Sequence, residues 1–287
     1  MSGGNGDGGP SDEDLALAKE AAVRAGMVLM SHFQKRIAGD RTVEHKGTVD
    51  LVTDADRAAE HTVLEILRVR RPDDAVIAEE KDAAGLGAAI AGRRWIVDPL
   101  DGTTNFAHAV PHFAVSIALW DGDRPLVGVV YAPAAGELFE AAAGRGAALA
   151  TFRRAGLVRG EPIRVSTVAP LREALCATGF PYDRHEADDD NTREHRAFLK
   201  ACQGVRRMGA AALDLAWVAA GRYDGYWEMK LKPWDVAAGA LIVREAGGRV
   251  TGYDGGALAP DMAKVVASNG LVHDEMVALL ASPSALR

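Results

Sequence analysis

Two aspartates that follow an apolar run supply the oxygen atoms that metal-assisted chemistry requires. Asp98 and Asp101 come after residues 95–97, Trp-Ile-Val, which we expect to form a buried strand that ends at Pro99. Hard divalent cations are bound by carboxylate and carbonyl oxygens. Residues 102–104, Gly-Thr-Thr, can begin a short helix, whose N–H groups attract phosphate. The segment therefore indicates metal-assisted phosphate chemistry, although Asp-Pro and Asp-Gly also occur in ordinary turns.

The run from Asp98 to Asn105, DPLDGTTN, resembles the DPxDGTxN signature of the inositol monophosphatase family. Other motifs extend the resemblance from about Leu15 to Leu280. It implies an α/β (α+β) layered sandwich of the inositol monophosphatase / fructose-1,6-bisphosphatase type. It also implies a phosphomonoesterase that uses about two or three Mg²⁺ ions per active site, is inhibited by lithium and forms a homodimer.

Two further motifs lie in the first third of the chain. Residues 50–56, DLVTDAD, look like the family's DLVTxxD segment, whose last aspartate orients a threonine that activates the attacking water. The resemblance therefore implies catalytic roles for Asp56 and Thr103, although Asp56 also fits a helix capping box. Residues 78–80, AEE, resemble the family's GEES motif. This implies that Glu79 binds metal and acts in catalysis, although the alanine that opens the motif departs from the pattern.

The second half of the chain carries another signature. Residues 234–239, WDVAAG, resemble the family's WDxAAG, which implies that Asp235 is the third aspartate of the metal site. Helix capping is the alternative role for this aspartate. Glu228 matches an upstream glutamate that accepts hydrogen bonds from substrate hydroxyls.

The last motif, RRMGAAALD at residues 206–214, is similar to RRxGSAALD, with Ala210 in place of the serine. In the family the backbone near its glycine approaches the substrate, so Gly209 and Ala211 are implied contacts; a tightly packed helix is the alternative. The implied metal ligands are Glu79, Asp98, the Leu100 carbonyl, Asp101 and Asp235. The implied catalytic residues are Glu79, Thr103 and Asp56. The implied substrate and phosphate contacts are Gly102, Thr103, Gly209, Ala211 and Glu228.

The hydrophobic pattern predicts the elements that position these residues. Ser11 and Asp14 form a capping-box pair ahead of a long helical stripe, and a second helix is expected near 54 to 70. A hairpin of residues 112–120 and 126–131 follows. Farther on we expect strands near 161–166, 173–178, 223–229 and 264–267, and helices near 191–201, 234–246 and 273–280. This alternation favours stacked α and β layers.

The same pattern divides the chain into four segments. We predict a flexible tail at 1–10, an N-terminal α+β half at 11–150 that carries most metal ligands, a surface excursion at 151–160, and a C-terminal α/β half at 161–287 that completes the active site. The active site is therefore expected at the junction of the two halves.

The composition is that of an ordinary globular protein. Of the 287 residues, 48% are hydrophobic and 25% are charged. The net charge of −7 gives no overall attraction to nucleic acid or to an anionic membrane, so a small phosphorylated substrate needs local cations. Cys176 and Cys202 are expected to be free thiols, and the N-terminus lacks a signal-peptide pattern. We therefore predict a cytoplasmic protein.

Several alternatives remain open. Related phosphatases for fructose 1,6-bisphosphate, histidinol phosphate and phosphoadenosine nucleotides share the implied metal core. A regulatory protein that binds transcription machinery is the alternative from another class, and its only candidate feature is the basic run Arg153, Arg154 and Arg159. Lys230 and Lys232 are either surface charges or a cradle for a second phosphate, if their strand extends far enough to place both on one face.

Overall fold

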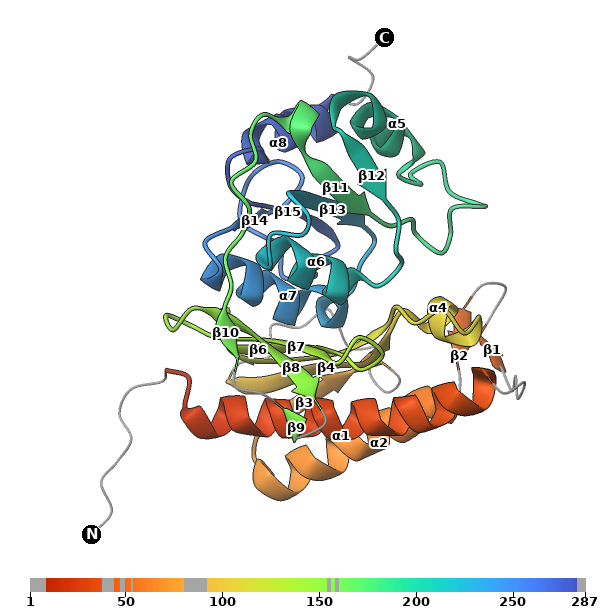
Figure 1. Cartoon of the computed structure of the whole chain (residues 1–287), viewed down its shortest axis with the longest axis vertical. Coiled ribbons are helices and arrows are strands. Elements are labelled where there is room, and N and C mark those ends of the chain that lie inside the picture. The colour runs from red at the N-terminus through yellow and green to blue at the C-terminus, as the bar shows by residue number, and fades with distance from the viewer. Residues whose placement is uncertain are drawn as a thin grey trace.

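Helices and sheets alternate in layers in the computed structural model, which describes residues 9–37, 44–46, 50–52, 54–79, 92–153, 156–157 and 160–282 (Figure 1). The outer helix layer is α1 (Asp12–Ile37) and α2 (Asp54–Arg70), the central one is α6 (Ala211–Ala219) and α7 (Pro233–Glu245), and the far one is α5 (Thr192–Ala201) and α8 (His273–Ala281). A sheet lies between each two layers. The predicted layered sandwich is therefore confirmed.

The large sheet lies between the outer and central helices. Its strands, in spatial order, are β10 (Glu161–Pro162), β8 (Ala147–Arg153), β7 (Glu137–Ala142), β6 (Arg124–Ala132), β5 (Ala114–Asp121), β4 (Arg93–Asp101) and β3 (Ala75–Ala78), with β9 (Gly156–Leu157) paired to β8. Only the β3–β4 pair is parallel among these described strands. The predicted hairpin is confirmed as β5 and β6.

The smaller sheet lies between the central and far helices. Its order is β12 (Gly204–Arg206), β11 (Leu175–Thr178), β13 (Gly225–Met229), β15 (Lys264–Ser268) and β14 (Arg249–Thr251). Shorter elements are the pair β1 (Glu44–Lys46) and β2 (Asp50–Val52), the helix α4 (Thr103–Ala107) and the 3₁₀ turn η1 (Leu171–Glu173). β11 and β13 are parallel, so their carboxyl ends lie at the same edge of the sheet.

Strand β4 is apolar on both faces because helices cover both. Trp95 and Val97 pack in the core shared with α1 and α2, whereas Ile96 packs in the core shared with α6 and α7. Side chains alternate between the faces of a strand, so a continuous apolar run is needed here. The strand that carries the site aspartates is therefore held from both sides.

Helix α7 lies very close to the large sheet, and this fixes the start of the helix. A Cβ atom at Gly128 would lie 2.7 Å from the Ala238 carbonyl oxygen, so only glycine allows this approach. The Ser116 hydroxyl on β5 donates a 3.0 Å hydrogen bond to the Trp234 carbonyl. These contacts place Asp235 over the carboxyl end of β4.

The predicted helix boundaries agree well with the structure. Ser11 and Asp14 form the reciprocal capping box, with N–H to side-chain distances of 3.1 and 3.3 Å, and α2 covers the predicted range. Thr53, which would complete the capping box expected for Asp56, lies outside the described residues. The Pro10 carbonyl accepts a 2.7 Å bond from Arg145, so the end of the predicted tail contacts the domain.

Two strand predictions need correction, and the segment expected as a surface excursion contains strand residues. Residues 151–153 continue β8 and residues 156–157 form β9, and Phe152 packs its ring against Tyr131 at 5.3 Å. The strand expected at 161–166 is only the two-residue β10. β13 begins at Gly225 rather than at residue 223.

Candidate active site

The first site element is the carboxyl end of β4, where Pro99 interrupts the strand without ending it. Asp98 pairs with Ser116 and Asp101 pairs with Ala114, with a register shift between them. The prediction that Pro99 ends strand pairing is therefore wrong, because pairing resumes two residues later. The shift lets the Leu100 N–H turn back to Asp98 Oδ1 at 2.9 Å, which fixes that carboxylate.

Helix α4 begins directly after Asp101, at a glycine that the backbone requires. Gly102 has a φ of +93°, and a Cβ there would lie 3.0 Å from the His112 carbonyl oxygen and 3.3 Å from the Gly209 carbonyl oxygen. The Thr103 hydroxyl, in the first turn, donates to the Leu100 carbonyl at 3.1 Å. The hydroxyl predicted to orient the attacking water, on Thr103, and the carbonyl predicted to bind metal, on Leu100, are therefore in contact.

The N-terminus of α6 holds Asp101 in place. The N–H groups of Ala211, Ala212 and Leu213 donate to its carboxylate at 3.0, 2.9 and 3.3 Å. An anion is favoured there because the first N–H groups of a helix have no partner within the helix. Ala211, which we predicted as a substrate contact, thus gives its N–H to a predicted metal ligand. Gly209 lies just before this turn, with a φ of +81°.

A cavity of about 470 Å³ opens over these elements. It is lined by Glu79, Asp98, Leu100, Asp101, Gly102, Thr103, Phe180, Pro181, Tyr182, Glu228, Met229, Lys230, Leu231, Lys232, Trp234 and Asp235. All the predicted metal ligands are in this set, as are Gly102, Thr103 and Glu228. Asp56, Gly209 and Ala211 are not in the lining.

Burial and mutual repulsion raise the pKa values of the pocket carboxylates. The pKa of Asp98 lies well above its usual range because of burial and the charges of Glu79, Asp101, Asp235 and Asp56. Burial, together with the Asp235 charge, raises the pKa of Asp101 to about 8, although backbone N–H groups oppose the shift. Asp56 is therefore near Asp98, while its proposed pairing with Thr103 stays a prediction.

The donor set fits a hard divalent cation in chemical type. Asp98 and Asp235, which come from the two halves of the chain, line the same cavity, and the Asp235 charge helps to raise the pKa of Asp98. Within the described residues, no three acidic, histidine or cysteine side chains are arranged as a complete metal cage.

The C-terminal half supplies the opposite wall. Asp235 is the third residue of α7, and it accepts the Lys232 N–H at 2.7 Å, so the expected capping position is corrected from the N-cap to the first turn. Burial raises the pKa of Asp235 to about 6. Glu228 accepts a hydrogen bond from the Tyr226 hydroxyl, and burial raises the pKa of Glu228 to about 7.

Sequence reasoning missed the wall formed by Phe180, Pro181 and Tyr182, which follows β11. It also missed Gly179, where a Cβ would lie 2.1 Å from a Glu228 carboxylate oxygen. No spacing signal links residues so far apart in the chain. The parallel β11–β13 pair brings them together, and a glycine before an aromatic residue was the only hint.

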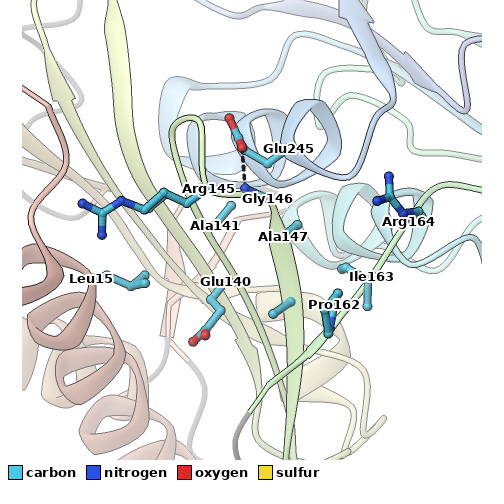
Figure 2. A pocket seen from close by; sticks show the side chains of 12 residues that line it. Leu15, Glu140, Ala141, Arg145, Gly146, Ala147, Pro162, Ile163, Arg164 and Glu245 are labelled. Carbon is cyan, nitrogen blue, oxygen red and sulfur yellow. Dashed lines mark hydrogen bonds between the residues drawn. The ribbon is translucent and has the colours of Figure 1, made fainter.

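A second cavity of about 330 Å³ lies between α1, the β7–β8 turn and the chain after β10 (Figure 2). Glu245 accepts 2.8 Å bonds from the N–H groups of Gly144 and Gly146 at its rim. Glu140, on its wall, forms an ion pair with Lys19. These acidic groups already have partners, so this cavity lacks the facing carboxylates of the first one.

Comparisons with known proteins show the family of the chain. A family model described as "Inositol monophosphatase family" matches residues 11–284. The chain belongs to the inositol monophosphatase family. It is 46% identical over 276 residues to an "Inositol-1-monophosphatase" of Synechocystis, which covers 95% of this chain and 91% of that protein. It is 40% identical to the "Nus factor SuhB" of Haemophilus influenzae, over 92% of this chain and 94% of that one.

Solved structures show the same fold. The inositol monophosphatase from Anabaena is 43% identical and superposes with a TM-score of 0.81 over 95% of this chain and 96% of that one. The extragenic suppressor protein SuhB from Bartonella henselae is 37% identical, also with a TM-score of 0.81, over 94% of this chain and 98% of that one. The family match and these structures confirm the predicted family and fold. In the part of the chain described, no helix is both long and apolar enough to cross a membrane.

Proposed function

We propose that this protein is a Mg²⁺-dependent phosphomonoesterase that hydrolyses inositol monophosphate to inositol and phosphate. One observation carries the proposal: a single pocket brings together Glu79, Asp98, Asp101 and Asp235 with the hydroxyl of Thr103. Acidic oxygen ligands from both halves of the chain suit hard cations. Membership of the inositol monophosphatase family supports the same activity.

The pocket residues have distinct proposed roles. Glu79, Asp98, Asp101, Asp235 and the Leu100 carbonyl would hold about two or three Mg²⁺ ions. Bound Mg²⁺ would acidify a water molecule and neutralise charge on the phosphate oxygens. Thr103 and Asp56 would together orient that water for in-line attack. The N–H groups near Gly102 at the start of α4 would bind phosphate.

The alcohol part of the substrate would lie against the C-terminal wall. Glu228 is half-buried and held by Tyr226, so its carboxyl can receive hydrogen bonds from ring hydroxyls in a fixed direction. Gly209 would lie close to the ring. No covalent enzyme intermediate is needed, because water attacks the phosphorus directly.

A substrate panel with purified protein tests the proposal. Phosphate release should be fastest with inositol monophosphate, compared with fructose 1,6-bisphosphate, histidinol phosphate and phosphoadenosine nucleotides, and should stop when EDTA removes Mg²⁺. Mg²⁺ should also raise the melting temperature without substrate, because ligand binding stabilises the folded state. A protein that releases no phosphate from any of these esters would overturn the assignment.

A regulatory role is the second candidate, because relatives at about 40% identity are named Nus factors. The basic run proposed for that role, Arg153, Arg154 and Arg159, has side chains outside the described residues. Binding of the purified protein to transcription machinery, with and without the Asp98→Asn change, separates the roles.

We also propose a cytoplasmic homodimer that lithium inhibits, which sedimentation and inhibition assays would test.

A further inference from the structure

The mouth of the active-site pocket is formed by two segments that lie far apart in the sequence. Residues 180–182 come shortly after β11. Residues 228–232 include the last two residues of β13 and the three residues that follow it. One ion pair joins them: Lys230 Nζ donates to both carboxylate oxygens of Asp183, at 3.0 and 2.8 Å. The side chain of Lys230 is 31% exposed and that of Asp183 is 50% exposed, so the ion pair lies at the rim of the pocket rather than in the interior.

Lys230 has a backbone conformation that ends the strand. Its φ is +60°, in the left-handed region that side chains other than glycine adopt at a cost. β13 accordingly ends at Met229 and does not extend through the two lysines. The premise that Lys230 and Lys232 share one face of a strand is therefore wrong, although both line the pocket.

The segment that carries Asp183 is anchored at both ends by one buried asparagine. Buried Asn191 donates to Thr178 Oγ1 at 2.8 Å and to the Gly179 carbonyl at 2.6 Å. Trp227 Nε1 donates to the same asparagine at 2.9 Å. Between these ends, the Phe180 ring contacts the His195 ring at 5.4 Å, and Lys264 lies 3.7 Å from Asp189. Lys230, through Asp183, links the chain directly after Tyr182 to the opposite wall of the pocket.

We propose that Lys230 is a specificity-determining residue that acts through Asp183. Their ion pair holds residues 180–182 over the pocket and restricts the alcohol part of the phosphomonoester to a compact group such as a cyclitol. The proposal rests on the phosphatase function proposed above. It assigns Lys230 a positioning role rather than direct contact with a second phosphate.

The second-phosphate hypothesis makes an opposite prediction for one variant. If Lys230 bound a second phosphate, Asp183→Asn would release its ammonium group and improve activity on a bisphosphate, whereas Lys230→Met would reduce it. If the ion pair acts as a latch that holds residues 180–182 over the pocket, Asp183→Asn and Lys230→Met both loosen these residues. The two variants must then shift selectivity in the same direction.

The experiment compares kcat/KM for inositol 1-phosphate and for the bulkier 2′-AMP. Wild type, Lys230→Met, Asp183→Asn and the double variant are measured, with Asp188→Asn as control. Asp188 is an exposed carboxylate in the same segment that has no ion pair among the described residues. Each single change should raise the 2′-AMP preference by about threefold, mainly through KM, because exposed ion pairs contribute modestly. The double variant should match either single one.

Several outcomes overturn the latch. Additive single effects, opposite shifts on fructose 1,6-bisphosphate, or an equal effect of Asp188→Asn would each exclude it. Amide hydrogen exchange gives a readout that does not depend on activity: residues 180–190 should exchange faster in Asp183→Asn than in wild type. If wild type lacks phosphatase activity, the proposed function fails, and unchanged exchange alone then rejects the latch.

Discussion

The β4–α4 corner (residues 98–107) and the β13–α7 wall (residues 228–235) present carboxylates to the same pocket but stabilise them differently. Asp101, in the corner, is held by the N-terminus of another helix, and its pKa is raised to about 8. Asp235, in the wall, is held by its own helix and by the nearby Lys232 charge, and its pKa reaches only about 6. A bound cation should therefore stabilise the ionised carboxylates of the corner more than that of Asp235 in the wall.

The largest expected effect is at the corner. Asp98→Asn should lower kcat/KM at least tenfold, or about 1.4 kcal/mol, because it removes a metal charge at constant side-chain volume. Stability without Mg²⁺ should be retained or increased, because repulsion from Glu79 and Asp101 falls. Activity assays and thermal melts of one preparation decide it. Asp123→Asn, in an exposed turn, is the matched control and should change neither.

Next in size is the hydroxyl of the corner. Thr103→Ala should lower kcat by about tenfold while the KM and the Mg²⁺ affinity stay near their wild-type values, because the hydroxyl acts on the attacking water. Thr103→Ser is the control, since it keeps a hydroxyl that can donate to the Leu100 carbonyl. An increase in KM with unchanged kcat would contradict this role.

The helix that supports the corner gives a smaller effect. Ala211→Pro removes the N–H that binds Asp101 Oδ1, and proline is tolerated at the first position of a helix. Losing one of three donors should weaken Mg²⁺ binding by about fivefold, as expected for a hydrogen bond to a charged group. Mg²⁺ titration by thermal shift measures it. Ala211→Ser retains the N–H and should bind Mg²⁺ like wild type.

The corner was readable from sequence because its parts are contiguous. Asp98, Asp101 and Thr103 lie within six residues, so a local motif predicted the strand end, the carboxylates and the short helix. The second helix was predicted almost to the residue for the same reason, since its hydrophobic period is local, and the start of the first helix was predicted from its capping box. Pro99 misled the prediction because a register shift accommodates it.

The opposite wall was only partly readable. Its motif located Glu228 and Asp235, but Phe180, Pro181 and Tyr182 enter the pocket through the pairing of β11 with β13. Such pairing depends on sheet order, which local periodicity does not encode. Likewise, the role of the α6 N-terminus follows from tertiary packing against Asp101. The residues that hold and enclose the site were therefore harder to predict than the residues that carry its chemistry.

The smallest expected effect on activity comes from His273, which lies outside both the corner and the wall. This buried imidazole receives the Ser268 hydroxyl at Nδ1 and donates Nε2–H to the Thr251 hydroxyl, each at 2.9 Å. Burial, with the Arg249 charge, lowers the pKa of His273 to about 4. The folded state therefore keeps this histidine neutral, and its variants should retain catalysis at neutral pH.

The sign of its pH effect is opposite to that of the pocket. Below about pH 6.5 the unfolded chain binds a proton at His273, whereas the folded state does not. The free energy of unfolding therefore falls as the pH drops toward 4, by at most about 3 kcal/mol. Asp101, with a folded pKa of about 8, takes up a proton on folding in the same pH range. Its contribution to stability therefore rises as the pH falls. Urea unfolding of wild type and His273→Gln in EDTA separates the two: the variant should lose less stability from pH 6.5 to 4. Parallel curves would show that the buried imidazole accepts its proton without cost, and the pocket carboxylates alone would then set the pH dependence.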